Sequence, residues 1–215
     1  AKTIFWTLFC VMAAGSGAMA FNRWADAKLD ARNPRTMHRI IPSGAISRNS
    51  ALIFVIACFV LLIIGAYQPN RLAFFLAPVP LGIFILSVYA KRFTSLSHFF
   101  MGVAMGMVPL GTWIAVTGRF NSDILFLSFG VFAWYVGFDL FYAMLDTNFF
   151  KRYRLYSIPS RYGFAFAVIT ARNMHLIAFF LFFVHGGIFS LGVCYFIGLV
   201  VSGRILVYEH YLVSR

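Results

Sequence analysis

Apolar runs of about twenty residues recur along the whole chain, and this repetition limits the possible folds more than any other feature. They cover roughly residues 1–21, 50–68, 71–90, 98–118, 122–144, 161–184 and 186–209. Each run is long enough to cross a bilayer core of about 30 Å as a helix. Only 11% of the 215 residues are charged, against about a quarter in soluble domains. A soluble fold of this length could not bury so much apolar surface, so the sequence predicts an all-α, polytopic transmembrane bundle.

The polar connections between these runs differ in length and charge on the two sides of the predicted membrane. Three longer connections, 22–49, 91–97 and 145–160, lie on one side, and that side carries 13 of the 18 Lys and Arg residues. The opposite side has three, and the other two fall within helices. The positive-inside rule therefore predicts that the long loops are cytoplasmic. The net charge of +12 is explained by these loops and by phosphate-bearing partners, not by nucleic acid.

Four of the six acidic residues form two compact clusters, each at the cytoplasmic end of a predicted helix. The clusters consist of Asn22, Asp26 and Asp30, and of Asp139, Tyr142 and Asp146. Spacings of i, i+4, i+8 and of i, i+3, i+7 predict that each cluster occupies one helix face. Stacked carboxylates repel one another, so they need a counter-charge. Mg²⁺ prefers oxygen ligands and accepts phosphate oxygens, which suits a magnesium-diphosphate site. The alternative interpretation is solvated helix ends paired with neighbouring Arg residues.

Several separated motifs resemble the UbiA family of intramembrane prenyltransferases. They are the NxxxDxxxD pattern from Asn22, the following Asn33-Pro34-Arg35-Thr36, the segment Lys91-Arg92-Phe93-Thr94, and the DxxYAxxD pattern from Asp139. They occur in the family's order and span nearly the whole chain. Ile158-Pro159-Ser160-Arg161 looks most like the menaquinone branch, whose members are often labelled 4-hydroxybenzoate polyprenyltransferases.

The resemblance implies a bundle of about nine helices, of which seven are present here. Residues 1–215 would then be a single membrane-embedded prenyltransferase domain cut from a longer protein at both ends. The catalytic and metal-binding residues implied are Asn22, Asp26 and Asp30 for one Mg²⁺, with Asp139 and Asp146 for a second. The substrate-binding residues implied are Asn22, Arg35, Arg39, Lys91, Arg92, Tyr142 and Arg161.

One position departs from the family pattern. The family's second motif usually has another Asp four residues beyond Asp146, whereas this sequence has Phe150. Either Asp139 and Asn148 complete the second metal shell, or that metal binds weakly. The departure affects the number of metal ions more than the class of reaction.

The implied activity is transfer of a polyprenyl chain from its diphosphate to a hydroxylated aromatic acid, of the 4-hydroxybenzoate or dihydroxynaphthoate type. This reaction belongs to ubiquinone and menaquinone biosynthesis, and the protein would lie in the bacterial inner membrane. A membrane terpene cyclase of the same superfamily is an alternative, since it would use similar acids without an aromatic acceptor. A transporter is a non-enzymatic alternative, because charges at helix ends also line permeation paths.

Two further groups of residues receive structural interpretations. The five histidines, His38, His98, His175, His185 and His210, are scattered without metal-ligand spacing, so we expect interfacial or loop roles. The pair Gly102 and Gly106 has the GxxxG spacing, which predicts close helix packing.

Overall fold

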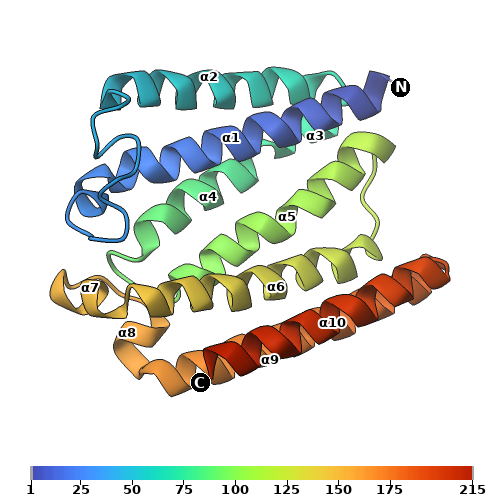
Figure 1. Cartoon of the computed structure of the whole chain (residues 1–215). Coiled ribbons are helices and arrows are strands. Elements are labelled where there is room, and N and C mark those ends of the chain that lie inside the picture. Colours follow the sequence, from blue (N-terminus) through green and yellow to red (C-terminus); the bar gives the residue numbers. More distant parts are fainter. Residues whose placement is uncertain (1, 215) are drawn as a thin grey trace. The chain divides into compact units, whose positions relative to one another are not determined.

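The computed structural model describes residues 2–214, and within this range its regular secondary structure is entirely helical, with no strand (Figure 1). The helices are α1 (Lys2–Asp30), α2 (Arg48–Tyr67), α3 (Arg71–Leu76), α4 (Pro78–Ala90), α5 (Ser97–Thr117), α6 (Ile124–Leu145), α7 (Thr147–Arg152), α8 (Ile158–Tyr162), α9 (Phe164–Ile188) and α10 (Val193–Val213). Among the described residues, seven helical stretches are long and apolar enough to cross a membrane, with α3 and α4 together counted as one. This confirms the seven predicted segments.

The first helix extends beyond the apolar run 1–21 to Asp30, as the helical spacing of its acidic cluster predicted. One predicted boundary was wrong. The break between the predicted runs 161–184 and 186–209 lies within α9, and the chain reverses instead at 189–192, where Ser190 has a φ of 49°. Two short helices, α7 and α8, occupy the connection 145–160. The end of a helix cannot be predicted from its apolar run alone, because tertiary packing can extend the helix further.

The chain divides into two compact units. The N-terminal unit comprises the residues up to Val88 together with Gly111–Arg119, and the C-terminal unit comprises Tyr89–Leu110 and the residues from Phe120 onward. The first acidic cluster lies in the N-terminal unit and the second in the C-terminal unit. The interpretation of the whole chain as one domain stays a prediction.

In the N-terminal unit, α1 and α2 lie side by side (Figure 1). Glycine makes this approach possible, because a Cβ on Gly17 would lie 2.8 Å from the Cβ of Cys58 and 2.8 Å from the ring of Phe59. Phe21, near the end of α1 that carries the acids, packs its ring against Phe59 and Phe84 at centroid distances of 6.2 and 6.1 Å. Small residues and offset aromatic rings therefore hold the helix that positions the first acidic cluster.

In the C-terminal unit, α6 packs along α9 (Figure 1). Their core is formed by Val136, Leu140, Phe141, Ile158, Ala167 and Ala171. The N-terminal part of α5 packs on α6 through the GxxxG pair, since a Cβ on Gly106 would lie 2.7 Å from the carbonyl oxygen of Ser128. A Cβ on Gly102 would likewise lie 3.0 Å from the ring of Phe132. The predicted role of these two glycines in helix packing is confirmed.

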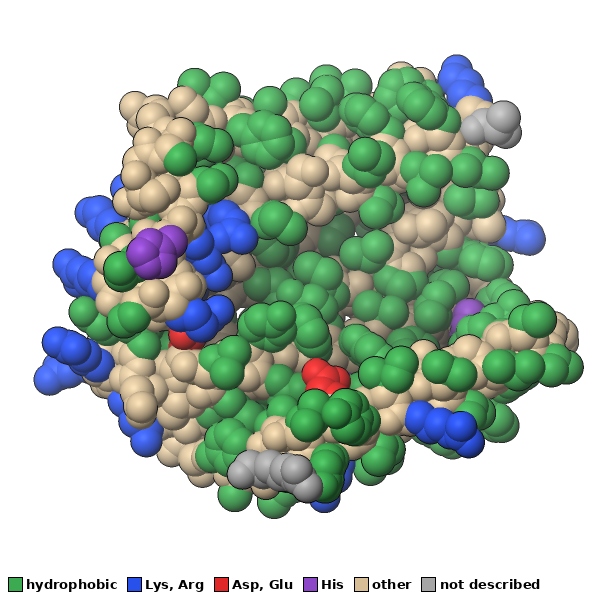
Figure 2. Space-filling view, in the orientation of Figure 1, with side chains coloured by type: hydrophobic (Ala, Val, Ile, Leu, Met, Phe, Trp, Pro, Cys, Tyr) green, Lys and Arg blue, Asp and Glu red, His purple; other side chains and the backbone are tan. Residues whose placement is uncertain are grey.

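The long helices expose large apolar side chains along much of their length. Examples are Ile53 on α2, Phe180 on α9 and Val193 on α10, which are 68%, 63% and 74% exposed. Figure 2 shows hydrophobic side chains spread over the visible faces of the helices, with few acidic ones among them. Such surfaces are stable against lipid and not against water.

Candidate functional site

The first acidic cluster lies on the last turns of α1. Because α1 continues to Asp30, helical geometry places Asn22, Asp26 and Asp30 on one face, as the spacing predicted. Asp26 and Asp30 are only 4% and 7% exposed. Burying a carboxylate costs free energy unless a counter-charge or hydrogen bonds compensate it. This end of α1 is therefore built to meet positive charge.

Arg39 supplies that charge to Asp30. Its Nη1 lies 2.9 Å from both carboxylate oxygens of Asp30. The chain reaches this position because residues 31–46 fold back in successive turns, in which the Thr36 hydroxyl donates to the Asp30 carbonyl at 3.2 Å. Asn33 accepts a hydrogen bond from the backbone N–H of Arg35 at 3.0 Å. The turn formed by residues 33–36 thus positions the Arg39 guanidinium against the acidic face of α1.

The second acidic cluster begins on α6 and ends just beyond it. Asp139 and Tyr142 lie within the helix, whereas Asp146 has φ −104° and ψ 10° and forms the junction with α7. The predicted helical stack therefore holds for Asp139 and Tyr142 and stops before Asp146. The Asp146 carbonyl accepts a hydrogen bond from the N–H of Phe150 at 2.9 Å, and this bond forms the first turn of α7. Tyr142 is half exposed.

A histidine that the sequence interpretation assigned to a loop or an interface is the partner of Asp139. The Nδ1 atom of His98, at the start of α5, lies 2.7 Å from Oδ2 of Asp139. The His98 side chain is 5% exposed and that of Asp139 is 35% exposed. Gly102, the first glycine of the GxxxG pair, lies four residues after His98. Since this pair packs α5 against α6, it was the one sequence signal that could have predicted a contact between His98 and α6. His98 fixes the orientation of the carboxylate from its buried side.

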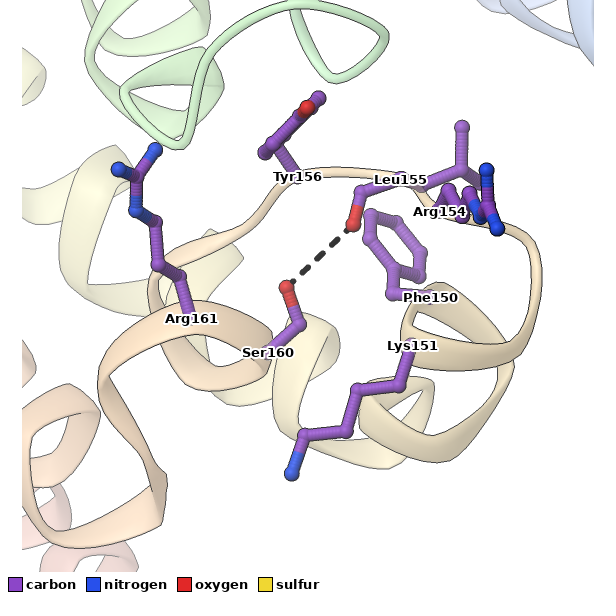
Figure 3. A pocket seen from close by; sticks show the side chains of 7 residues that line it. All are labelled: Phe150, Lys151, Arg154, Leu155, Tyr156, Ser160 and Arg161. Carbon is purple, nitrogen blue, oxygen red and sulfur yellow. Dashed lines mark hydrogen bonds between the residues drawn. The ribbon is translucent and has the colours of Figure 1, made fainter.

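Three cations predicted to bind substrate, Lys91, Arg92 and Arg161, lie on two connections of the C-terminal unit that are joined by a backbone hydrogen bond. Lys91 and Arg92 lie in the turn after α4, and the Lys91 carbonyl accepts from the N–H of Tyr156 at 2.7 Å. The Arg92 guanidinium stacks on the Tyr89 ring at 4.7 Å from its centroid. Arg161 lies on α8 and lines a cavity of about 340 Å³ (Figure 3). Residues 91–92 and 150–161, distant in sequence, therefore form one basic region.

The donor atoms of both clusters suit a hard divalent cation. Among residues 2–214, no three His, Cys, Asp or Glu side chains gather as a ready-made metal cage. Mg²⁺ does not need one, because it is commonly held by one or two carboxylates while water and phosphate oxygens complete its shell. The buried pair Asp26 and Asp30, with the amide oxygen of Asn22 on the same face, fits this requirement.

Two more histidines pair inside the C-terminal unit. Nδ1 of His175 on α9 lies 2.9 Å from Nε2 of His210 on α10, and both side chains are buried. Phe141 of α6 packs its ring against both imidazoles, at centroid distances of 5.6 and 4.9 Å. Gly137 leaves the space that the His175 ring occupies. The expected interfacial or loop roles are wrong for this pair, which instead joins three helices.

These features define an integral membrane protein whose helices end in buried carboxylates and basic turns. More particularly, the chain belongs to the UbiA prenyltransferase family, whose model matches residues 1–215. It is 26% identical over 200 residues to a 4-hydroxybenzoate octaprenyltransferase of Vibrio atlanticus, covering 93% of this chain and 70% of that relative. It is 35% identical over 133 residues to a protoheme IX farnesyltransferase of Bartonella henselae. That match covers 60% of this chain and 43% of the relative, so the chain spans less than half of the farnesyltransferase's length.

Solved structures agree on the fold. The apo structure of a UbiA homolog from Aeropyrum pernix K1 matches with a TM-score of 0.91 and 27% identity, covering 98% of this chain and 80% of that one. A structure described as a digeranylgeranylglyceryl phosphate synthase matches with a TM-score of 0.71 and 20% identity, covering 98% and 74%. The second likeness concerns the fold alone. Together they confirm the predicted all-helical UbiA fold.

Proposed function

We propose that the protein transfers a polyprenyl chain from a polyprenyl diphosphate to a hydroxylated aromatic acid in quinone biosynthesis. The acids we have in mind are of the 4-hydroxybenzoate or dihydroxynaphthoate type, the latter in the menaquinone branch. The observation that carries the proposal is the pair of buried carboxylates on α1, Asp26 and Asp30, with Arg39 held against one of them. Family membership supports the reaction class, and relatives named 4-hydroxybenzoate octaprenyltransferase support the acceptor.

The residues we assign to the diphosphate form two groups. Asn22, Asp26 and Asp30 would hold one Mg²⁺, and Asp139 and Asp146 would hold a second if it binds. The magnesium would supply positive charge to the leaving diphosphate. Arg35, Arg39, Lys91, Arg92 and Arg161 would neutralise the remaining phosphate charge, and Tyr142 would donate a hydrogen bond. The loops that carry these groups would face the cytoplasm, where the positive-inside rule places them.

Arg39 has a double role in this proposal. Without substrate it neutralises Asp30, from which its Nη1 atom lies 2.9 Å. Mg²⁺ held by Asp30 would neutralise that carboxylate, and the Arg39 guanidinium could then donate to a phosphate oxygen. The allylic C–O bond then breaks with its electron pair leaving on the diphosphate. The electron-rich ring carbon bonds to the prenyl cation and then loses its proton to the released diphosphate, which restores aromaticity. The buried helix ends exclude water, which would otherwise capture the cation.

Prenyl transfer in isolated membranes tests the proposal. We expect Asp26→Asn and Asp30→Asn to lower turnover by at least about a hundredfold, since each removes a charge that acts on the leaving group. Chelation with EDTA should abolish turnover, and added Mg²⁺ should restore it. Asp123→Asn is the matched control, because Asp123 is an acid at the start of α6 whose side chain makes no capping hydrogen bond.

The acceptor is tested in the same membranes with 4-hydroxybenzoate, dihydroxynaphthoate and protoheme offered separately. Transfer to either acid supports the proposal, and transfer to protoheme alone would refute it. Undiminished turnover in the Asp26 variant, or in the presence of chelator, would refute the metal-diphosphate assignment.

A further inference from the structure

An apolar groove lies between α2 and α4 in the N-terminal unit. Its volume is about 350 Å³, and its walls are formed by Ile56, Phe59, Val60, Ile63, Ile64 and Leu81. We infer that this groove holds an acyl chain of an anionic phospholipid, whose headgroup binds to Arg71 and Tyr67 at the mouth of the groove. The inference does not depend on the function proposed above.

The groove forms because α4 bends away from α2. The short helix α3 that precedes α4 packs against α2, and the rings of Tyr67 and Phe74 meet edge to face at a centroid distance of 5.5 Å. Pro78 and Pro80 follow, and proline removes a backbone donor and bends a helix. Figure 1 shows α4 diverging from α2 beyond this point. The two walls therefore meet at the end near Tyr67 and separate along the rest of α2.

Helical geometry places both headgroup residues above the walls of the groove. Tyr67 follows Val60 by seven residues, so the two share one face of α2. Arg71 precedes Leu81 by ten residues, which at 100° per residue returns to within about 80° of the same direction. Ala77 keeps a helical backbone between α3 and α4, with φ −55° and ψ −36°. Tyr67 is 56% exposed and Arg71 is exposed, so a phenol and a guanidinium lie at the mouth.

The dimensions of the groove match one chain of a phospholipid. From Ile56 to Tyr67 the helix α2 rises about 16 Å at 1.5 Å per residue, which is close to half of a bilayer core of about 30 Å. All side chains of the walls are aliphatic or aromatic. Tyrosine and arginine are typical of the headgroup level, where an apolar body meets a polar end. A lipid can therefore bury its chain in the groove while its phosphate lies at the mouth.

The charge at this end of the unit favours an anionic headgroup. The acids of the N-terminal unit, Asp26 and Asp30, lie at the opposite end of α1, whereas this end carries Lys2, Arg71 and Arg119. The positive-inside rule keeps cations away from the outer side of a membrane. Cations that lie there without a neighbouring acid indicate an anionic partner.

A side-chain contact brings the segments of the two arginines together. Nδ2 of Asn70 donates to the carbonyl oxygens of Ile114 and Ala115 on α5, at 2.9 and 3.1 Å. Arg71 directly follows Asn70, and Arg119 lies two residues beyond the end of α5. A guanidinium binds phosphate oxygens through two parallel hydrogen bonds. Arg71 at the mouth, with Arg119 adding to the positive field, suits the phosphate of a lipid.

A polyprenyl tail is the other hydrocarbon that would fit apolar walls. A magnesium-bound diphosphate needs carboxylates as well as cations, and the mouth of the groove has only the cations. The carboxylates of this unit lie at the far end of α1. The observations therefore favour the phospholipid, and competition between the two ligands distinguishes them.

Lipid binding to the full chain in detergent, measured by native mass spectrometry, tests the headgroup site. The wild type should bind palmitoyl-oleoyl phosphatidylglycerol about tenfold more tightly than the matching phosphatidylcholine, as one charge-assisted hydrogen bond would give. Arg71→Gln should reduce this preference to about twofold or less. Arg48→Gln is the matched control and should keep the preference, because Arg48 is an exposed cation at the other end of α2.

A second pair of variants tests the chain site. Val60→Trp fills the groove, whereas Leu61→Trp adds the same side chain at a neighbouring position outside it. Val60 and Leu61 are 50% and 44% exposed, so both variants should fold and have similar melting temperatures. We expect Val60→Trp to weaken binding of both phospholipids about tenfold and Leu61→Trp to weaken it less than twofold, because only the first occupies the space of the acyl chain.

Several results would overturn the inference. They are equal affinity of the wild type for the two phospholipids, equal effects of Arg71→Gln and Arg48→Gln, and equal binding by the two tryptophan variants. Displacement of phosphatidylglycerol by a polyprenyl diphosphate would assign the groove to that ligand instead. Displacement by inorganic phosphate would show that the cations bind the ion without a contribution from the chain.

Discussion

Removal of the Arg39 guanidinium tests how the acidic face of α1 is stabilised. In Arg39→Met the aliphatic part of the side chain remains, but Asp30 loses the atom that lies 2.9 Å from both of its oxygens. The Asp30 side chain is 9% exposed and that of Arg39 is 33% exposed. Removing one partner of a fully buried pair costs about 3–5 kcal/mol, and a hydrogen bond to a charged group contributes about 1.5–3 kcal/mol. Because Arg39 is partly exposed, we expect a loss of about 2 kcal/mol.

For a chain of this length, a loss of that size lowers the melting temperature by about 4–8 °C. The assay is thermal unfolding in nanodiscs with EDTA, followed by tryptophan fluorescence. Lys28→Met is the matched control, because Lys28 lies at the same end of α1 and its cationic side chain is exposed. We expect it to shift the melting temperature little. Adding Mg²⁺ with a polyprenyl diphosphate should restore most of the loss in Arg39→Met, since a cation at Asp30 replaces the missing charge.

A double-mutant cycle isolates the pair from other effects of the substitution. In an Asp30→Asn background there is no carboxylate to neutralise, so Arg39→Met should cost little further stability. Equal losses in the two backgrounds, or an unchanged melting temperature of Arg39→Met in EDTA, would refute the assignment of Arg39 as the counter-charge of Asp30.

Two further predictions concern the C-terminal unit and α5. Gly137→Ala places a methyl group 2.5 Å from Cδ2 of His175, so we expect a loss of about 1–3 kcal/mol from overpacking. A Cβ added by Gly111→Ala meets no described atom within 4 Å. This variant should therefore raise the free energy of unfolding by about 0.5–1 kcal/mol, because the unfolded chain loses backbone entropy. Melting temperatures of the Gly137 and Gly111 variants that shift in the same direction would contradict this reasoning. His98→Ala should lower kcat about tenfold or more by freeing Asp139, and His98→Gln, which still donates a hydrogen bond, should recover part of it. Equal kcat in the two His98 variants would refute a role of the hydrogen bond between residue 98 and Asp139 in catalysis.

The sequence predicted the features that depend on local periodicity. Long apolar runs indicate spans because a bilayer demands a minimum length, and all seven appear. The spacing of Asn22, Asp26 and Asp30 indicates a shared face because the helical repeat is fixed, and α1 continues far enough to realise it. The GxxxG spacing of Gly102 and Gly106 similarly indicates close packing because a backbone without Cβ atoms permits it.

Features that depend on contacts between helices escaped the sequence interpretation. His98 lies 41 residues from Asp139, and His175 lies 35 from His210. No local spacing connects such residues, so only the packing of α5 on α6 and of α9 with α10 reveals these pairs. The left-handed backbone of Arg154 was hidden for a different reason, because an arginine gives no sequence signal for that conformation.

The histidine pair between α9 and α10 also bears on how the chain enters the membrane. An imidazole facing hydrocarbon alone would leave polar nitrogen atoms without partners, which costs free energy. His175 satisfies part of this requirement only when α10 is beside it, with His210 at 2.9 Å. The turn at residues 189–192 joins the two helices closely in sequence. The free energy of insertion therefore favours delivery of α9 and α10 to the bilayer as a preassembled hairpin, with the second helix shielding a polar group of the first.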